Sequence, residues 1–180
     1  MTASIPLDDQ SLVDAAGRGD PGAFETLYRR HRDTLVRLAR RFTGSDDLAL
    51  DVLQETFVYL LSKLPGLRLT ARLTTFLYPA VKNLSIAARR KAARLGGDDL
   101  PRDLPAPPPP ADDRHPDLAE ALKNLSEEHR ETLLMRFVDG MSLEEIAAAL
   151  DVPLGTVKSR LHNALASLRA DDRLNKYFER

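Results

Sequence analysis

The stretch Met141–Arg169, MSLEEIAAALDVPLGTVKSRLHNALASLR, predicts two short helices joined by a tight turn. The first helix starts at Ser142, whose hydroxyl can cap it, and Glu145 three residues later completes a capping box. It ends at Asp151-Val152-Pro153, because the residue before a proline resists the α-helical region. A second helix starts near Leu154, and its apolar residues recur every three or four positions, so one face is buried.

The opposite face of this second helix carries the side-chain types that bond to base edges and phosphates in a DNA major groove. The small Ala147 in the first helix allows the two helices to approach closely. These features favour a DNA-binding helix-turn-helix over the alternative, an ordinary helical hairpin with a polar face. The side chains expected to contact DNA are Thr156, Lys158, Ser159, Arg160, His162 and Asn163.

The composition is that of a globular chain. Its 180 residues are 43% hydrophobic, enough for one domain or two small ones. The absence of cysteine excludes disulfides, thiol catalysis and cysteine-ligated zinc, and it suits a cytoplasmic protein. No apolar run approaches the roughly 18 residues of a membrane span, so no membrane insertion is expected. The first 20 residues are acidic where a signal peptide would be basic.

Charge is distributed unevenly along the chain. The net charge is only −1, but residues 21–95 contain 14 Lys and Arg against 6 Asp and Glu. Such a basic block indicates a polyanionic partner, although it is also compatible with an ordinary solvated surface.

Helix caps and apolar periodicity predict six further helices and no strand, so the fold class is all-α. Leu61 and Phe137 are among the apolar side chains that we expect in the cores. Pro79 lies inside the fourth of these helices, where it should bend the helix or mark its true start. The expected helices are 11–18, 21–42, 46–63, 73–95, 117–124 and 127–138.

Residues 96–116 separate two helical bodies. This segment holds PAPPPP at 105–110 together with several acidic residues, and it has too few apolar groups to offset the entropy of ordering. Consecutive prolines favour an extended chain. The sequence therefore predicts two small helical domains, 1–95 and 117–180, joined by an extended Pro-rich acidic linker.

Two constellations in the first domain suggest binding. Asp51, Gln54 and Glu55 share one helix face, which is either a docking surface or merely solvated. Phe76 precedes a run of basic residues, an arrangement that suits single-stranded nucleic acid, because aromatic rings stack on bases while cations follow the backbone. The alternative is that Phe76 belongs to the core.

Nothing in the sequence indicates catalysis. The four histidines lie far apart without ligand spacing, so no metal site is expected. There is no glycine-rich phosphate loop and no convincing pair of nucleophile and base, so the sequence predicts a protein that is not an enzyme and needs no cofactor.

Four stretches carry a family resemblance. In order they are AFETLYRRHRDTLVRLARRF, DVLQETFVYLL, TTFLYPAVKNLSIAARRKA and LSEEHRETLLMRFVDGMSLEEIAAALDVPLGTVKSRLHNALASLR. Together they resemble the extracytoplasmic-function (ECF) group of bacterial RNA polymerase sigma factors, in the sigma-70 family, over about residues 10–170. The resemblance implies a promoter-specificity factor that binds core polymerase, recognises the −10 and −35 elements and promotes DNA melting. The alternatives are a helix-turn-helix regulator that acts without core polymerase and a helical protein-interaction module.

The resemblance also implies roles for particular residues. The face of Asp51, Gln54 and Glu55 would dock on the clamp helices of the polymerase β′ subunit, and the β flap would be a second polymerase contact. The loop Gly66–Arg72 with Asn83 would capture a base flipped from the −10 element. The resemblance further implies an anti-sigma factor as the inhibitory partner. The residues expected at −10 DNA are Arg68, Phe76, Lys82, Asn83, Arg89, Arg90, Lys91 and Arg94.

The chain departs from the family pattern at several positions. Phe76 stands where tryptophan is common, which reduces the stacking area, and Pro79 replaces a basic residue. Asp151 occupies the turn position that many helix-turn-helix proteins give to glycine. His162 and Asn163 differ from an arginine-rich pattern, so the target sequence cannot be borrowed from relatives.

Overall fold

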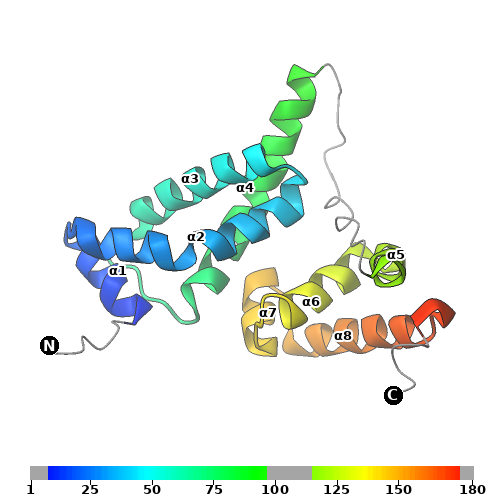
Figure 1. Cartoon of the computed structure of the whole chain (residues 1–180). Helices are drawn as coiled ribbons and strands as arrows, with labels where there is room; N and C mark the ends of the chain where they lie inside the picture. The colour runs from blue at the N-terminus through cyan, green and yellow to red at the C-terminus, as the bar shows by residue number, and fades with distance from the viewer. Residues whose placement is uncertain (1–7, 97–114, 175–180) are drawn as a thin grey trace, which may run out of the picture. The chain divides into compact units, whose positions relative to one another are not determined.

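A computed structural model describes residues 8–96 and 115–174, and this part of the chain is helical without any strand (Figure 1). The all-α prediction is confirmed. The chain divides into two compact units between Leu104 and Pro105, while most of the predicted linker, residues 97–114, lies outside the described residues. The elements are α1 (Asp9–Gly17), α2 (Pro21–Thr43), α3 (Asp46–Lys63), α4 (Leu73–Leu95), α5 (Pro116–Asn124), α6 (Glu127–Phe137), α7 (Leu143–Leu150), α8 (Leu154–Arg169) and the 3₁₀ turn η1 (Asp172–Leu174).

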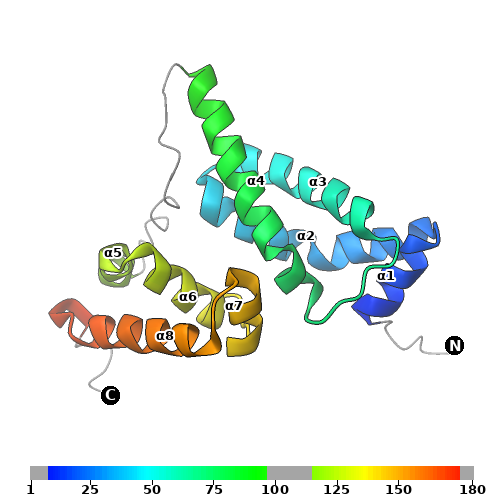
Figure 2. The same cartoon turned by 180° about the vertical axis from the view of Figure 1, so that it is seen from behind.

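The first unit is a bundle in which α2, α3 and α4 pack against one another and α1 packs on α2 (Figures 1 and 2). Helix α2 starts where the Asp20 carboxylate accepts hydrogen bonds from the N–H groups of Gly22 (2.9 Å) and Ala23 (3.2 Å). It ends at Gly44, whose φ of 68° is a conformation that suits glycine. The bundle core is formed by Leu27, Leu35, Val52, Leu60, Leu73, Leu77, Tyr78 and Val81.

Helix α4 crosses the bundle, and its C-terminal half extends past the ends of α2 and α3 (Figures 1 and 2). It begins at Leu73 as predicted and continues through Pro79, which is exposed. The alternative that Pro79 marks the true start of the helix is therefore wrong. A proline in the second turn removes one backbone donor, and here the buried neighbours Leu77 and Tyr78 hold the helix in place.

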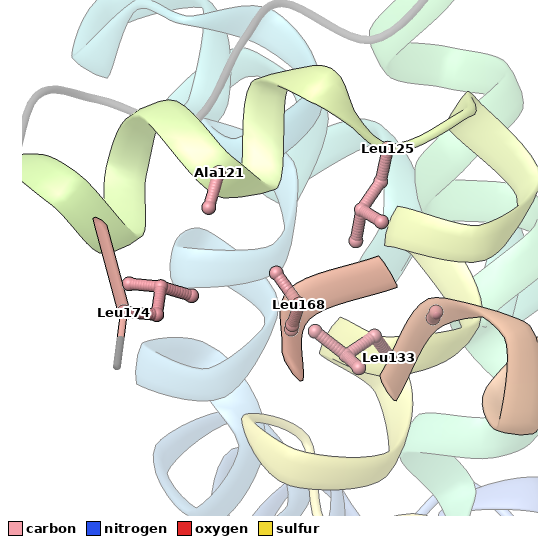
Figure 3. Close-up of a cluster of buried hydrophobic side chains, with 6 residues drawn as sticks. Ala121, Leu125, Leu133, Leu168 and Leu174 are labelled. Atoms are coloured by element: carbon pink, nitrogen blue, oxygen red, sulfur yellow. The ribbon is translucent and has the colours of Figure 1, made fainter. Parts of the chain in front are cut away.

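In the second unit α6, α7 and η1 pack against α8, α7 also contacts α6, and α5 packs against η1. The side chains of this unit converge between α5, α6, α8 and η1, as Figure 3 shows. Leu161 and Leu165, expected on the buried face of α8, lie partly buried beside this cluster. The cluster consists of Ala121, Leu125, Leu133, Ala164, Leu168 and Leu174.

Three sequence predictions about the helices are wrong. Helix α1 begins at Asp9 and not near Ser11, because the Asp8 carboxylate caps it by accepting from the Ser11 N–H (2.7 Å), a bond that also lowers the pKa of Asp8. Leu61 is 48% exposed and Phe137 is 62% exposed, although both were expected in the core. Leu61 lies on the outer face of α3, and Phe137 ends α6 beyond its buried face.

The turn between α7 and α8 forms as the sequence predicts. Ser142 Oγ accepts from the Glu145 N–H (3.1 Å), and the Ser142 N–H donates to Glu145 Oε2 (2.8 Å), so the capping box is complete. Asp151 ends α7 with a φ of 53°, the one positive φ of a non-glycine residue in the described part of the chain. A side chain in this region is strained, so the turn is held at some cost.

Asp151→Gly is expected to stabilise the second unit by about 0.5 kcal/mol, because relief of left-handed strain exceeds the added freedom of the unfolded chain. Chemical denaturation of the full chain measures the change. The matched control is Gly140→Ala: Gly140 has a φ of 63° and open space around it, so strain alone should destabilise that variant. A lower stability of Asp151→Gly would contradict the assignment of strain.

Candidate functional site

Helix α8 presents most of the predicted DNA-contacting residues on one open face. Val157 is fully buried and fixes the inner side of the helix. Lys158, Ser159, His162 and Asn163 are exposed, and their spacing of three and four residues places them in one stripe. Thr156 is half-buried, and its carbonyl oxygen accepts from Ser159 Oγ (2.9 Å).

Arg160 is placed differently from the rest of this set. Its side chain is only 19% exposed, and its guanidinium lies 3.2 Å from the Glu128 carboxylate of α6. Glu128 itself is 66% exposed, so the ion pair lies at the edge of the α8 face. The open stripe therefore excludes Arg160 while the pair holds.

Acidic groups of α7 also lie near α8. The pKa of Glu144 is lowered, mainly by a hydrogen bond from its own backbone N–H, then by the Ser142 hydroxyl and by the charges of Lys158 and Arg136. Lys158 is thus within electrostatic reach of a carboxylate at the start of α7. The positive charge in the N-terminal half of α8 is therefore partly offset by acidic side chains of the same unit.

The outer face of α3 combines acidic, amide and apolar groups. Asp51, Gln54 and Glu55 are all exposed, as the sequence predicts for a shared polar face. Val58 (65% exposed) and Leu61 (48% exposed) continue the same face toward the end of the helix. Sequence reasoning missed this apolar part, because a leucine at helical spacing is expected in a core. An exposed apolar surface beside charged groups is typical of a protein-binding site.

Helix α4 carries the basic residues predicted at −10 DNA, except Arg68, which lies in the loop before it. Lys82 is half-buried, with Nζ 5.9 Å from the centre of the Phe42 ring, and Asn83 next to it is exposed. Arg41 of α2 shares this ring, at 5.3 Å, and donates to the Tyr78 hydroxyl (3.3 Å). Nothing in the sequence links Arg41 with Lys82, because the two belong to different helices.

Beyond the bundle, α4 continues as a basic stripe. Lys91 and Arg94 are exposed, while Arg89 and Arg90 are half-buried. Residues 83, 90 and 94 lie seven and four positions apart, so they share one face of the helix. Residues 89–94 belong to the C-terminal half of α4, the half that extends past α2 and α3 (Figure 2).

The two aromatic residues of α4 have different environments. Tyr78 is fully buried, with its ring edge-on to Phe42 at 5.9 Å. Phe76 is half-buried and stacks on Tyr59 of α3, with ring centres 6.3 Å apart and planes 22° apart. Lys63 Nζ lies 5.4 Å from the Tyr59 ring. Phe76 and Tyr59 therefore form a partly exposed pair of rings beside a cation, and spacing alone could not find Tyr59.

The loop between α3 and α4 borders an open hollow of about 690 Å³. Arg68 in this loop has a side chain 78% exposed and lies 3.4 Å from the Asp14 carboxylate of α1. Asn83 is not among the described residues that line the hollow. These are Asp8, Asp9, Gln10, Arg30, Leu69, Ala71 and Arg72.

Metal sites and membrane spans are both absent from residues 8–96 and 115–174. No group of three or more His, Asp or Glu side chains there is arranged to hold a metal ion. None of the helices in these ranges combines the length and the hydropathy that a bilayer span requires.

Comparison with known proteins identifies the chain's family. The sigma-70 region 2 model matches residues 27–95, and the sigma-70 region 4 model matches residues 121–170. The chain is 33% identical over 171 residues to the ECF RNA polymerase sigma factor SigE of Mycolicibacterium smegmatis, covering 88% of this chain and 65% of that protein. It is 30% identical over 172 residues to the RNA polymerase sigma-H factor of Pseudomonas aeruginosa, covering 87% of this chain and 89% of that protein.

A solved structure supports the same relationship. CnrH, solved in complex with the cytosolic domain of CnrY, superposes with a TM-score of 0.66 at 27% identity, covering 90% of this chain and 95% of that chain. The alternative of a helix-turn-helix regulator that acts without core polymerase is not favoured, because the chain also matches sigma-70 region 2. With both conserved regions present in order, and a relative aligned along nine tenths of its length, the chain belongs to the ECF sigma factors, the promoter-specificity subunits of bacterial RNA polymerase.

Proposed function

We propose that the first unit binds core RNA polymerase and the −10 element, and that the second unit reads the −35 element. The single observation that carries this is the match of regions 2 and 4 to one chain, each within its own compact helical unit. Residues 1–95 and 117–180 are the proposed domains, with 96–116 as the linker. The test is transcription in vitro with core polymerase and this chain on a defined promoter. A regulator that acts without polymerase would bind the DNA but fail to initiate.

The proposed polymerase contact on the first unit is the outer face of α3. The Asp51 and Glu55 carboxylates and the Gln54 amide would meet arginines of the β′ clamp helices, since charge-assisted bonds to guanidinium groups are the stronger class. On the second unit we propose a contact with the β flap. It is supported by Phe137 and Val138, which are 62% and 70% exposed at the end of α6.

The proposed −10 surface follows α4 and the loop before it. Lys82, Arg89, Arg90, Lys91 and Arg94 would follow backbone phosphates, because clustered cations supply the electrostatic part of binding. Phe76, which stacks on the Tyr59 ring, would also stack against an unpaired base. Asn83 and Arg68 would contact bases or phosphates of the melted strand. Their amide and guanidinium groups are both exposed.

Asn83→Ala is expected to reduce open-complex formation about fivefold, because an edge hydrogen bond that offsets base extrusion would be lost. Permanganate reactivity of thymines in the bubble measures the melted fraction. Asn124→Ala is the control, since Asn124 is an exposed asparagine on α5. Normal reactivity in the Asn83 variant would remove this residue from the −10 site.

The proposed −35 surface is the open stripe of α8. Lys158, Ser159, His162 and Asn163, with Thr156 beside them, carry donors and acceptors suited to base edges and phosphates. Arg160 would contact DNA only if its guanidinium left the Glu128 carboxylate and bound a DNA phosphate. The carboxylate and the phosphate compete for this guanidinium, so the Glu128 and Arg160 ion pair opposes DNA binding.

Glu128→Gln is therefore expected to raise affinity for −35 duplex, because it releases Arg160. The gain is expected to be only about twofold, because an exposed ion pair contributes little free energy. Fluorescence anisotropy at fixed salt measures the dissociation constant. Glu120→Gln is the control, because it removes the same charge from an exposed site on α5. A gain of equal size in both variants would point to net charge and not to release of Arg160.

We further propose that an anti-sigma factor holds this chain inactive in the cytoplasm, where polymerase acts. CnrH was solved with a second protein bound, and it is similar to this chain over nearly its full length. A mixed acidic and apolar face such as that of α3 suits an inhibitor that competes with polymerase.

A further inference from the structure

Helix α1 holds the loop that follows α3 through one glutamine side chain. Gln10 Oε1 accepts from the Leu69 N–H (2.7 Å), and Gln10 Nε2 donates to the Leu67 carbonyl oxygen (3.1 Å). The loop lies outside any helix, so these backbone groups have no helical partners. Gln10 satisfies both groups from nearly sixty residues away in the sequence.

The orientation of the Gln10 amide is fixed by a third bond. Gln10 Nε2 also donates to the Asp14 carboxylate (2.7 Å), one turn further along α1. Reversing the amide would place its oxygen against both the Leu67 carbonyl and the Asp14 carboxylate, so one orientation alone satisfies all three bonds. The other oxygen of Asp14 lies 3.4 Å from the Arg68 guanidinium.

A close approach fixes the other end of the same contact. A Cβ atom on Gly17 would lie 2.9 Å from the Leu64 carbonyl oxygen, closer than real Cβ atoms come. Only glycine allows α1 to pass so near the backbone at the start of the loop. Helix α1 is thus fitted along the loop from Leu64 to Leu69.

The held loop also forms one wall of the open hollow. Leu69, Ala71 and Arg72 contribute from the loop and its end, while Asp8, Asp9 and Gln10 contribute from the start of α1. A loop that discriminates between bases must hold its hydrogen-bonding groups within a fraction of an ångström. The hydrogen bonds from Gln10 to the loop backbone fix the position of the loop independently of the loop side chains.

We propose that Gln10 is a positioning residue that sets the preference for the flipped −10 base by fixing the backbone of the loop Leu64–Arg72. This inference rests on the proposed function, in which the loop before α4 is part of the −10 surface, and on the base capture that the family resemblance implies for it. Gln10 acts through the loop and does not itself need to touch DNA. Its loss therefore lowers discrimination between bases more than it lowers binding to polymerase.

The experiment uses the full chain with Gln10→Met, a side chain of similar length that makes neither bond. Hydrogen exchange is expected to be at least about fivefold faster at the Leu69 amide, because its acceptor is gone. With core polymerase, the ratio of open-complex formation on the best and second-best −10 base is expected to fall about fivefold. Core affinity is expected to stay unchanged.

Two further variants separate this role from folding. Gln10→Glu keeps an acceptor for the Leu69 N–H but cannot donate to Leu67, so it is expected to shift the base preference in the same direction. Ser11→Ala, on the same helix and away from the hollow, is expected to leave both loop exchange and base preference unaltered.

The outcomes distinguish the two levels of the proposal. Unchanged exchange at Leu69 in Gln10→Met would overturn the positioning role. Faster exchange with an unaltered base preference would reduce Gln10 to a structural residue and overturn the specificity role. If the unmodified chain with core polymerase shows no −10 base preference, the proposed −10 function of the loop fails, while the exchange result still reports on the Gln10 contact.

Discussion

Replacing both Asp51 and Glu55 by lysine is expected to weaken binding to core polymerase about a hundredfold, the largest effect among the predictions. Both side chains are exposed on the outer face of α3. If they meet guanidinium groups in a desolvated contact, each reversal loses a charge-assisted bond and adds a like-charge repulsion. A loss of about 2.7 kcal/mol in binding free energy corresponds to that hundredfold change.

The effect must be separated from net charge and from folding. Glu25→Lys with Asp33→Lys is the matched control, because both acidic residues are exposed on α2 of the same unit and the total charge changes equally. Core affinity is measured by titration with labelled factor, and −35 duplex binding by anisotropy. The Asp51 and Glu55 double variant should keep its duplex binding. Equal core affinity in the two double variants would show that α3 is not the polymerase contact.

Local signals in the sequence were enough to predict the turn between α7 and α8. Asp151 and Pro153 end α7, and the Ser142 and Glu145 capping box that starts this helix lies in the same short stretch. Hydrogen bonds between near neighbours follow from residue type and spacing, so such features can be predicted without a tertiary structure.

Contacts between distant segments could not be predicted in this way. The Glu128 and Arg160 ion pair and the bonds from Gln10 to its loop depend on how helices pack, and no local pattern encodes them. Leu61 and Phe137 show the converse error. Apolar periodicity identifies residues that prefer burial, but it cannot distinguish burial in this chain from burial against a partner.

The roles of the exposed polar residues stay predictions for a related reason. Exposure on one face of α8 defines which side chains are able to reach DNA, but not which base each one reads. His162 and Asn163 differ from the arginine-rich pattern, and they are the exposed residues that follow Lys158 and Ser159 along the face. Base preference at −35 therefore has to be measured on this chain.

Lys158→Ala is expected to lower affinity for the cognate −35 duplex about tenfold to thirtyfold. The residue lies in the N-terminal part of α8, which is the part of a recognition helix that contacts base edges. Loss of one good base contact costs about 1–3 kcal/mol, and this range includes the expected change. Lys158 also offsets the acidic charge of Glu144, so its loss leaves Arg136 as the remaining cation that acts on this carboxylate.

The salt dependence and the sequence dependence of binding separate a base contact from a phosphate contact. If Lys158 reads a base, the loss is confined to the cognate site, and scrambled −35 duplexes bind both proteins equally. If it contacts phosphate alone, binding falls by the same factor on every duplex, and the slope of log affinity against log salt decreases by about 0.9. Lys123→Ala is the control, because it removes a cation from α5, where Lys123 pairs with Glu120 at 3.2 Å. Unchanged affinity of Lys158→Ala for the cognate duplex would show that the open face of α8 is not the −35 surface.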